Sequence, residues 1–441
     1  MCRPAAFDAW TPTRHADAIR PAVPVHRFPP DVGRTLGKRA VRGLGMKTHP
    51  VLIIVVAQLL GTSLWFSANS AAADLVRAWG MTDAQLGLLT GAVQLGFIAG
   101  TLAFALSGLA DRFAASRIVF VCSWLGALFN AGFALLSTGI TDGAAYRFAV
   151  GLCLAGIYPL GMKLIVSWVP DRAGAALGWL VGMLTLGTAL PHGVRAAGAG
   201  LPWQGVVLAS SVLAVIGGLI VAGLGDGPHV KRAARGASRG WGQVLGVFGI
   251  AKFRASAFGY FGHMWELYAF WTLVPLLVAR TLQRGGGAAP VGTVALLSFA
   301  IIGVGSLGCI VGGQWSRTIG SARVAAMALT VSGLLCAVFP WLEAAPQWVV
   351  LSALVVWGIA VVADSPQFSA LSAQNCPPHL VGSALAIQNA IGFFITVCAI
   401  WVATHMIGTL GSKVAWLLLP GPVIGWMALR PLWRATPPAS S

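Results

Sequence analysis

His263 and Glu266 are the two residues whose types and spacing most clearly suggest chemistry. They lie in a strongly apolar stretch, 253–279, together with Gly259 and Gly262. In a helix these four positions, i, i+3, i+4 and i+7, share one face, and a face of small residues with His and Glu does not suit lipid. Because burial favours the neutral carboxyl and His is close to neutral already, both side chains could take up and release a proton. A static pair that braces the fold is the alternative.

Asp364 and Lys163 stand in two other apolar stretches, each close to a proline. Asp364 comes two residues before Pro366, and Lys163 comes four residues after Pro159. Proline frees backbone carbonyls and kinks a membrane helix. Asp364 is therefore predicted to join the proton-coupling groups. Lys163 could form an ion pair with Asp364 that a substrate anion displaces, or it could extend to the membrane surface.

A second set of candidates could contact a solute directly. Arg147 could bind an anion, although it lies only about four residues into the apolar stretch 143–167 and could instead reach the membrane surface. Amide side chains offer hydrogen bonds to a solute, and Trp residues at matched positions could form aromatic walls, but amides also often join neighbouring helices. With Lys163, the predicted substrate-binding residues are Arg147, Asn69, Trp65, Trp271, Gln388 and Asn389.

The sequence motifs of several kinds of chemistry are absent from this chain. There is no G-x-x-x-x-G-K-[ST] phosphate loop, no H-E-x-x-H metal motif, and no C-x-x-C among the seven cysteines. A G-x-G-x-x-G run at 303–308 lies inside an apolar stretch without the preceding strand that a dinucleotide site needs. The sequence therefore predicts no cofactor, no metal site and no enzymatic activity.

The composition indicates what kind of fold must position these residues. Of 441 residues, 57% are hydrophobic and only 9% are charged, and the mean hydropathy is +0.80. Soluble domains carry about 25% charged residues, so this chain could not cover a soluble surface. An all-α membrane protein with many spans is predicted, and most classes of soluble enzyme are excluded.

Twelve apolar stretches are long enough to cross the hydrocarbon core, which takes about 20 helical residues. They recur from Val51 onward with short polar breaks between them. The predicted spans are 51–73, 84–107, 117–138, 143–167, 173–195, 203–225, 253–279, 291–314, 322–342, 347–371, 380–406 and 414–431.

The net charge of +17 is explained by topology. With twelve spans both ends of the chain share one side, and a cytoplasmic assignment leaves only five Lys or Arg residues outside, namely Arg77, Arg195, Arg280, Arg284 and Lys413. This is the bias that the positive-inside rule expects in an inner or plasma membrane. Binding to nucleic acid is not needed to account for the basic residues.

The chain also divides into two similar halves. Residues match at an offset of about 206 positions: Trp65 with Trp271, and Pro159 with Pro366. Two parallel six-span repeats follow from this. The predicted divisions are a disordered cytoplasmic tail at 1–46, helical bundles at 47–225 and 253–431, a cytoplasmic linker at 226–252 and a tail at 432–441. A rival interpretation starts translation at Met46.

The polar loop after the second span carries a family resemblance. It reads Gly108-Leu-Ala-Asp111-Arg112 and continues to Arg117, and a weaker copy runs from Gly313 through Arg317 to Arg323. This loop resembles the G-x-L-x-D-R-x-G-R-R signature of the major facilitator superfamily, and its echo stands at the repeat spacing. Ala115 replaces the usual Gly, and Ser316 replaces the Asp of the second copy. We expect Gly108 to allow two helices to approach closely and Asp111 to form a charge pair. The residues predicted to form a cytoplasmic gate are Gly108, Asp111, Arg112, Arg117 and Arg317.

Two further segments are similar to superfamily patterns. Arg147, Gly151 and Gly156 resemble the R-x-x-x-G segment of the fourth span, a family position associated with proton coupling. Gly178, Gly187, Pro191 and Gly193 match only half of the antiporter pattern, which helix packing explains as well. No motif identifies a subfamily, and the general character is that of anion porters.

The resemblance covers the chain from about residue 50 and implies two six-helix bundles around a cavity that opens alternately to either side. The function expected is secondary transport, proton-linked, of a small organic or inorganic anion, with the solute, protons and the lipid bilayer as partners. The family functions as a monomer. An efflux antiporter for amphipathic compounds and a non-transporting sensor or scaffold are the rivals.

Overall fold

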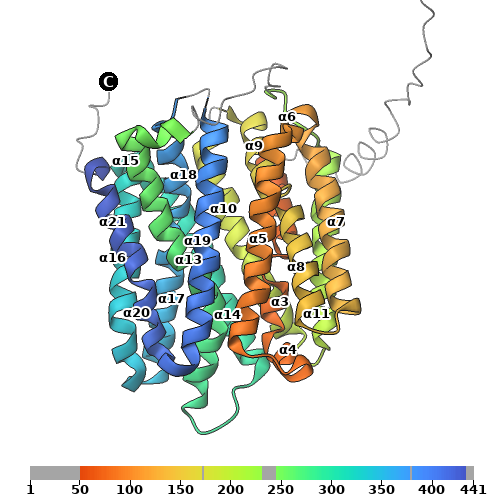
Figure 1. Ribbon diagram of the computed structural model, residues 1–441, viewed down its shortest axis with the longest axis vertical. Helices are drawn as coiled ribbons and strands as arrows, with labels where there is room; N and C mark the ends of the chain where they lie inside the picture. The colour runs from red at the N-terminus through yellow and green to blue at the C-terminus, as the bar shows by residue number, and fades with distance from the viewer. Residues whose placement is uncertain (1–49, 171–172, 231–244, 378–379, 434–441) are drawn as a thin grey trace, which may run out of the picture.

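The computed structural model describes residues 50–170, 173–230, 245–377 and 380–433, and in these ranges every regular element is helical. Figure 1 shows the helices running side by side along the long axis. The first half contains α2 (Pro50–Thr62), α3 (Ser67–Ser70), α4 (Ala72–Trp79), α5 (Asp83–Ser107), α6 (Leu109–Arg112), α7 (Ala115–Leu136), α8 (Ile140–Leu154), α9 (Tyr158–Trp168), α10 (Ala173–Ala197) and α11 (Trp203–Leu224).

The second half begins with a short 3-10 helix, η2 (Val247–Gly249). It continues with α13 (Ala251–Gln283), α14 (Val291–Gly303), α15 (Gly305–Ile319), α16 (Ser321–Val338), η3 (Phe339–Ala344), α17 (Gln347–Ala363), α18 (Ser365–Gln374), α19 (Val381–Leu410), η4 (Gly411–Val414), α20 (Ala415–Leu418) and α21 (Pro420–Trp433). The predicted tails, 1–46 and most of 432–441, and much of the linker lie outside the described residues.

Nine helical stretches within the described ranges are long and apolar enough to cross a membrane. One of them, Val381–Leu432, has 52 residues, which is the length of two crossings. The prediction of an all-α membrane fold is confirmed. Several spans that were expected to be continuous are broken, however: the first between α2 and α3, the fourth between α8 and α9, the eighth between α14 and α15, and the tenth at Asp364.

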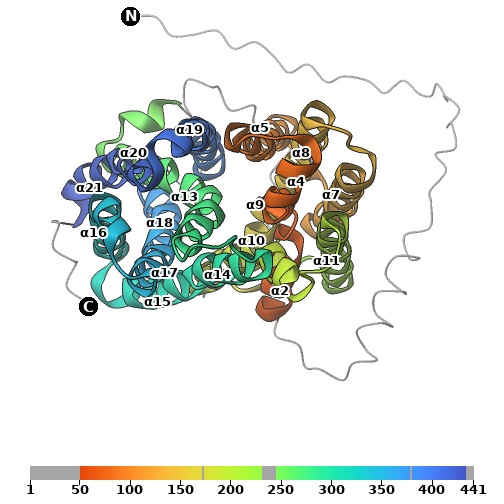
Figure 2. The ribbon, with the colours of Figure 1, turned by 90° about the horizontal axis from the view of Figure 1, so that it is seen from below.

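The helices form two groups, which Figure 2 shows in projection along their axes. Elements α2 to α11 make up one group and α13 to α21 the other. The groups meet where α5 packs against α19 and where α10 packs against α14 and α15. A continuous apolar core crosses this junction, with Trp65 from one group and Trp271 from the other fully buried in it.

Glycine allows the closest helix contacts in both groups. A Cβ on Gly151 of α8 would lie 2.1 Å from the Val93 carbonyl oxygen of α5. In the second group, a Cβ on Gly262 of α13 would lie 2.3 Å from the carbonyl oxygen of Gly421 on α21. Small residues at such crossings let the backbones of membrane helices touch. The small-residue face of α13 therefore packs against α21 and does not face lipid.

The start of the linker is attached to the first helical group. The carboxylate of Asp226 accepts hydrogen bonds from the backbone N–H of Ala115 at 3.1 Å and of Ser116 at 2.8 Å, and so caps α7. Ser167 at the end of α9 accepts a bond from the backbone N–H of Gly227 at 3.1 Å. Asp226 thus fixes the last residues of the signature loop.

Replacing Asp226 by Asn is expected to loosen the first turn of α7. Loss of a charged cap costs about 1 kcal/mol, which corresponds to roughly fivefold faster amide exchange if local opening limits it. Hydrogen exchange at Ala115 and Ser116 measures this. Asp142→Asn is the control, because Asp142 caps α8. Equal acceleration at these two amides in both variants would contradict a local capping role.

Candidate functional site

Glu266 is fully enclosed by hydrogen-bond donors of the second helical group. Its Oε1 accepts from the indole N–H of Trp357 at 2.6 Å and from the thiol of Cys336 at 3.3 Å, and its Oε2 accepts from the hydroxyl of Ser332 at 3.0 Å. The side chain is 1% exposed. Three hydrogen bonds from neutral donors can hold a carboxylate in this position.

His263 and Asp364 form a buried acid–base pair in the same helical group as Glu266. His263 Nδ1 lies 2.9 Å from Asp364 Oδ1, and each side chain is 1% exposed. Asp364 stands between α17 and α18, where the tenth span is broken. The other ring nitrogen, Nε2, has no hydrogen-bond partner among the described residues. The three predicted proton-coupling residues therefore gather where α13, α16, α17 and α18 meet.

One further titratable ring faces this cluster. The ring of Tyr260 lies 6.1 Å from the ring of His263. The ring of Phe368, on α18, lies 5.6 Å from the ring of His263. No group of three or more His, Cys, Asp or Glu side chains among the described residues has the arrangement of a metal site. The chemistry available to the cluster is thus proton exchange between one imidazole and two carboxyls.

Arg147 is buried in the first helical group and donates hydrogen bonds to the break between α2 and α3. Its guanidinium donates to the Ser67 hydroxyl and to Asn130 Oδ1, both at 3.0 Å, and to the backbone carbonyls of Leu64 and Trp65. These carbonyls belong to the gap between α2 and α3, where helical bonds are missing. With an exposed fraction of 0%, the side chain does not extend to the membrane surface, which was one of its two predicted placements.

Lys163 lies on α9 and donates to the backbone carbonyl of Ala110 in α6. This contact ties the fourth span to the signature loop. Asp364, the predicted partner of Lys163, is placed against His263 instead. The predicted ion pair between Lys163 and Asp364, which would have joined the two halves, is therefore replaced by a contact of Asp364 with His263 of its own half.

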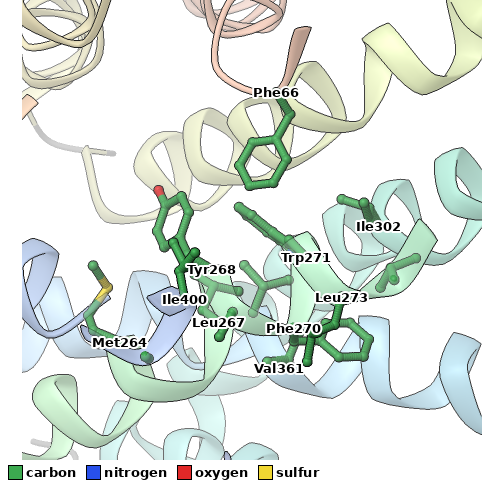
Figure 3. Close-up of a cluster of buried hydrophobic side chains, with 14 of the residues drawn as sticks. Phe66, Met264, Leu267, Tyr268, Phe270, Trp271, Leu273, Ile302, Val361 and Ile400 are labelled. Carbon is green, nitrogen blue, oxygen red and sulfur yellow. The ribbon is translucent and has the colours of Figure 1, made fainter. Parts of the chain in front are cut away.

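The two matched tryptophans meet in a cluster of rings between the helical groups. Trp65 lies 5.7 Å from Tyr268, and Phe66 lies 6.0 Å from Trp271 and edge-on to it. Figure 3 shows Phe66, from the break between α2 and α3, approaching Trp271 and Tyr268 of α13. Trp65 also contacts Phe393 of α19 at 5.8 Å. We call these five residues the aromatic cluster.

The predicted amides differ in their surroundings. Asn69 donates to the Thr90 hydroxyl at 2.8 Å and thereby joins α3 to α5. Gln388 is 1% exposed and its Oε1 has no partner among the described residues, whereas Asn389 is half-buried. Gln94, which sequence reasoning missed, accepts from the Trp65 indole N–H at 3.3 Å. Its own Nε2, like Trp271 Nε1, has no partner in the described part of the chain.

The sequence pattern of the Major Facilitator Superfamily matches residues 53–435, which is most of the chain. The chain belongs to this superfamily. It is therefore a multi-pass membrane protein and a secondary transporter, not an enzyme, and the predicted family and fold are confirmed.

Individual relatives of this superfamily member are more distant. It is 32% identical over 129 residues to the niacin transporter NiaP of Acinetobacter baylyi, and the match spans only 28% of that protein's length. Two solved structures share its fold: a bacterial homolog of the human lysosomal transporter Spinster, in an inward-facing and unoccupied conformation, and a D-xylose-proton symporter. The first has a TM-score of 0.60 at 15% identity and covers 91% of this chain and 95% of its own. The second has a TM-score of 0.64 at 14% identity and covers 88% and 97%.

The superfamily signature loop shows one correction to the sequence analysis. Gly108 was expected to permit close helix packing, but no atom lies within 4 Å of a Cβ placed there. Its φ of 63° is left-handed and ends α5, which is the reason for glycine at this position. Arg112, Arg117 and Arg317 are exposed. The side chain of Asp111 lies outside the described residues, so its predicted charge pair is not described.

The residues that sequence reasoning missed are mostly partners of buried charges. Ser332, Cys336 and Trp357 surround Glu266, while Ser67 and Asn130 hold Arg147. Each is a lone polar or aromatic residue in an apolar span, which resembles ordinary helix packing in the sequence. A signal that could have found them is the need of every buried charge for several hydrogen-bond partners.

Proposed function

We propose that this superfamily transporter couples proton movement to the transport of a small organic anion, and that helix α13 links the two processes. The observation that carries the proposal is that α13 presents His263 and Glu266 on one face and rings of the aromatic cluster on another. Glu266 points into the second helical group, and Tyr268, two residues later and about 200° around the helix, contacts the first group.

Coupling through α13 needs only local changes of charge. When Glu266 loses its proton, the donors of α16 and α17 bind its carboxylate more strongly. When Glu266 is protonated, the same donors bind the neutral carboxyl group more weakly. Exchange of a proton between His263 and Asp364 changes the attraction across the break between α17 and α18. Either event shifts the preferred position of α13, and Tyr268 and Trp271 move with it against Trp65 and Phe66. Such differential contacts are what a two-state transporter requires.

The aromatic cluster suggests the chemical class of the solute. Flat rings favour stacking with another ring, and the unpartnered N–H groups of Gln94 and Trp271 favour an acceptor such as a carboxylate or ring nitrogen. Niacin, in the name of the relative from Acinetobacter baylyi, is a molecule of this kind. We therefore propose small heteroaromatic monocarboxylates as the solute class, with Gln388 and Asn389 as further contacts.

Arg147 has a positioning role in this proposal. It holds the carbonyls of Leu64 and Trp65, which flank the Cα of Trp65, and so it sets where the Trp65 ring stands. Lys163 stabilises the signature loop, whose Gly108, Asp111, Arg112 and Arg117, with Arg317 of the second copy, we propose as the cytoplasmic gate. We further propose that both chain ends are cytoplasmic, that the transporter resides in the inner membrane, and that it acts as a monomer.

The solute proposal predicts that Trp271→Phe weakens the stabilisation of the purified protein by nicotinate at least tenfold in apparent Kd. Phenylalanine keeps a ring but removes the indole N–H, and a lost hydrogen bond to a charged group costs about 1.5–3 kcal/mol. Thermal unfolding with increasing nicotinate measures the affinity.

Trp348→Phe is the matched control, because Trp348 is 70% exposed and remote from the cluster. Equal weakening in both variants would argue against a specific site. Stabilisation by lipophilic cations alone, with no response to nicotinate, would instead favour the export of amphipathic compounds.

A further inference from the structure

A hollow on the outer face of the second helical group is lined by none of the aromatic-cluster residues and by none of His263, Glu266 and Asp364. It has a volume of about 380 Å³ between α15, α16 and α17, and no ionisable side chain lines it. Its floor includes the small residues Gly312, Ala328 and Ala360. Its walls include Trp315 and Met327, with exposed fractions of 54% and 50%. We call it the outer groove.

A second hollow of about 480 Å³ continues the outer groove along α16. The two share Met327 and Val331, so an elongated molecule can occupy both. The second hollow also contacts Trp426 of α21 and Arg323 of α16, and Arg323 is its one charged lining residue. Together they form an apolar trough with a cationic end.

Arg323 supplies the charge that selects an occupant. It is exposed, two residues inside the start of α16, and takes part in none of the ion pairs between described residues. Arg317, near the end of α15, adds a second exposed positive charge a few residues away in the chain. A basic residue near a membrane surface attracts anionic lipid by about 1 kcal/mol.

We propose that the outer groove and the hollow beside it are a binding site for one anionic glycerophospholipid. An acyl chain lies on the small-residue floor between α15, α16 and α17, where an unfilled hollow would lose packing contacts. The phosphate lies against Arg323, and the amphipathic ring of Trp315 borders the chain near the headgroup level. The site prefers phosphatidylglycerol to phosphatidylcholine because only the first carries a net negative charge.

Native mass spectrometry of the full-length protein in detergent tests the site. Phosphatidylglycerol and phosphatidylcholine with identical chains are titrated against the wild type and two variants. Arg323→Gln is expected to weaken phosphatidylglycerol about fivefold, the equivalent of about 1 kcal/mol, and to leave phosphatidylcholine unchanged. Val331→Trp, which fills the region shared by both hollows, is expected to weaken both lipids. Lys252→Gln removes an exposed base on α13 and is expected to change neither.

Four outcomes would overturn the proposal. The role of Arg323 is contradicted if Arg323→Gln keeps the full preference for phosphatidylglycerol, or if Lys252→Gln removes that preference equally. The groove argument fails if Val331→Trp binds both lipids like the wild type. Competition by glycerol 3-phosphate as strong as that by the intact lipid would show a phosphate site without an acyl chain. Retained phosphatidylcholine binding in Arg323→Gln also shows that this variant is folded.

Discussion

Replacing Glu266 by Gln is expected to abolish solute accumulation driven by a pH gradient, while exchange of solute down its own gradient continues. Glutamine has nearly the shape of the protonated acid but cannot lose a proton. It therefore holds the second helical group in one of the two states that coupling needs. Proteoliposomes with an imposed pH gradient measure accumulation, and counterflow of labelled nicotinate without that gradient measures exchange.

Glu343→Gln is the matched control for Glu266→Gln. Glu343 contacts Ser412 and Arg284 in a partly exposed position outside the proton-exchanging cluster, so its replacement should leave accumulation intact. Proton-driven accumulation in Glu266→Gln at the wild-type level would rule out Glu266 as the coupling group. In that case His263→Gln and Asp364→Asn become the decisive variants, since they are the remaining acid–base pair of the cluster.

Replacing Arg147 by Met is expected to destabilise the whole first helical group by about 3–5 kcal/mol. The substitution removes the guanidinium donors of Asn130 Oδ1 and of two backbone carbonyls in the membrane interior, and breaking a buried charged network costs this much. The yield of monodisperse protein in detergent and its unfolding temperature measure the loss. Arg147→Lys should restore only part of it, because a lysine cannot reproduce the planar set of donors.

Arg117→Met is the control for this loss. Arg117 is exposed, so this substitution removes the same kind of charge from the surface. The measurement also separates two roles for Arg147. If Arg147→Met unfolds at the wild-type temperature but no longer binds nicotinate, Arg147 is a solute contact and not a support of the helix break.

The candidate proton-coupling residues were within reach of sequence reasoning, whereas their surroundings were not. An ionisable residue in the middle of an apolar span is costly, so Glu266 and Asp364 stand out against their neighbours. The helical spacing of His263 and Glu266 also predicts that they share a face. The pairing of Asp364 with His263 was not predicted, because it depends on how α13 crosses the break at the end of α17. Repeat symmetry pointed to Lys163 instead.

The role of Arg147 shows why the remainder was not predictable. Its partners include backbone carbonyls that are free only because the first span breaks at residues 63–66, and that segment contains no proline or glycine. The break therefore follows from tertiary packing and not from local propensity. Asp226 was missed for a similar reason, since its capping of α7 joins positions that are 110 residues apart in the chain. Gly108 was recognised from the family signature, but its physical reason is visible only in the backbone angle.

The way in which Arg147 is held bears on the electrical behaviour of transport. Its acceptors among the described residues are a hydroxyl, an amide and two carbonyls, all neutral, so its positive charge is not cancelled locally. That charge travels with the first helical group whenever the group tilts in the membrane. A unit charge that crosses the whole bilayer gains about 2.3 kcal/mol per 100 mV, and a tilt captures a fraction of this energy. We therefore expect the membrane voltage to bias which side the transporter faces even before a solute binds.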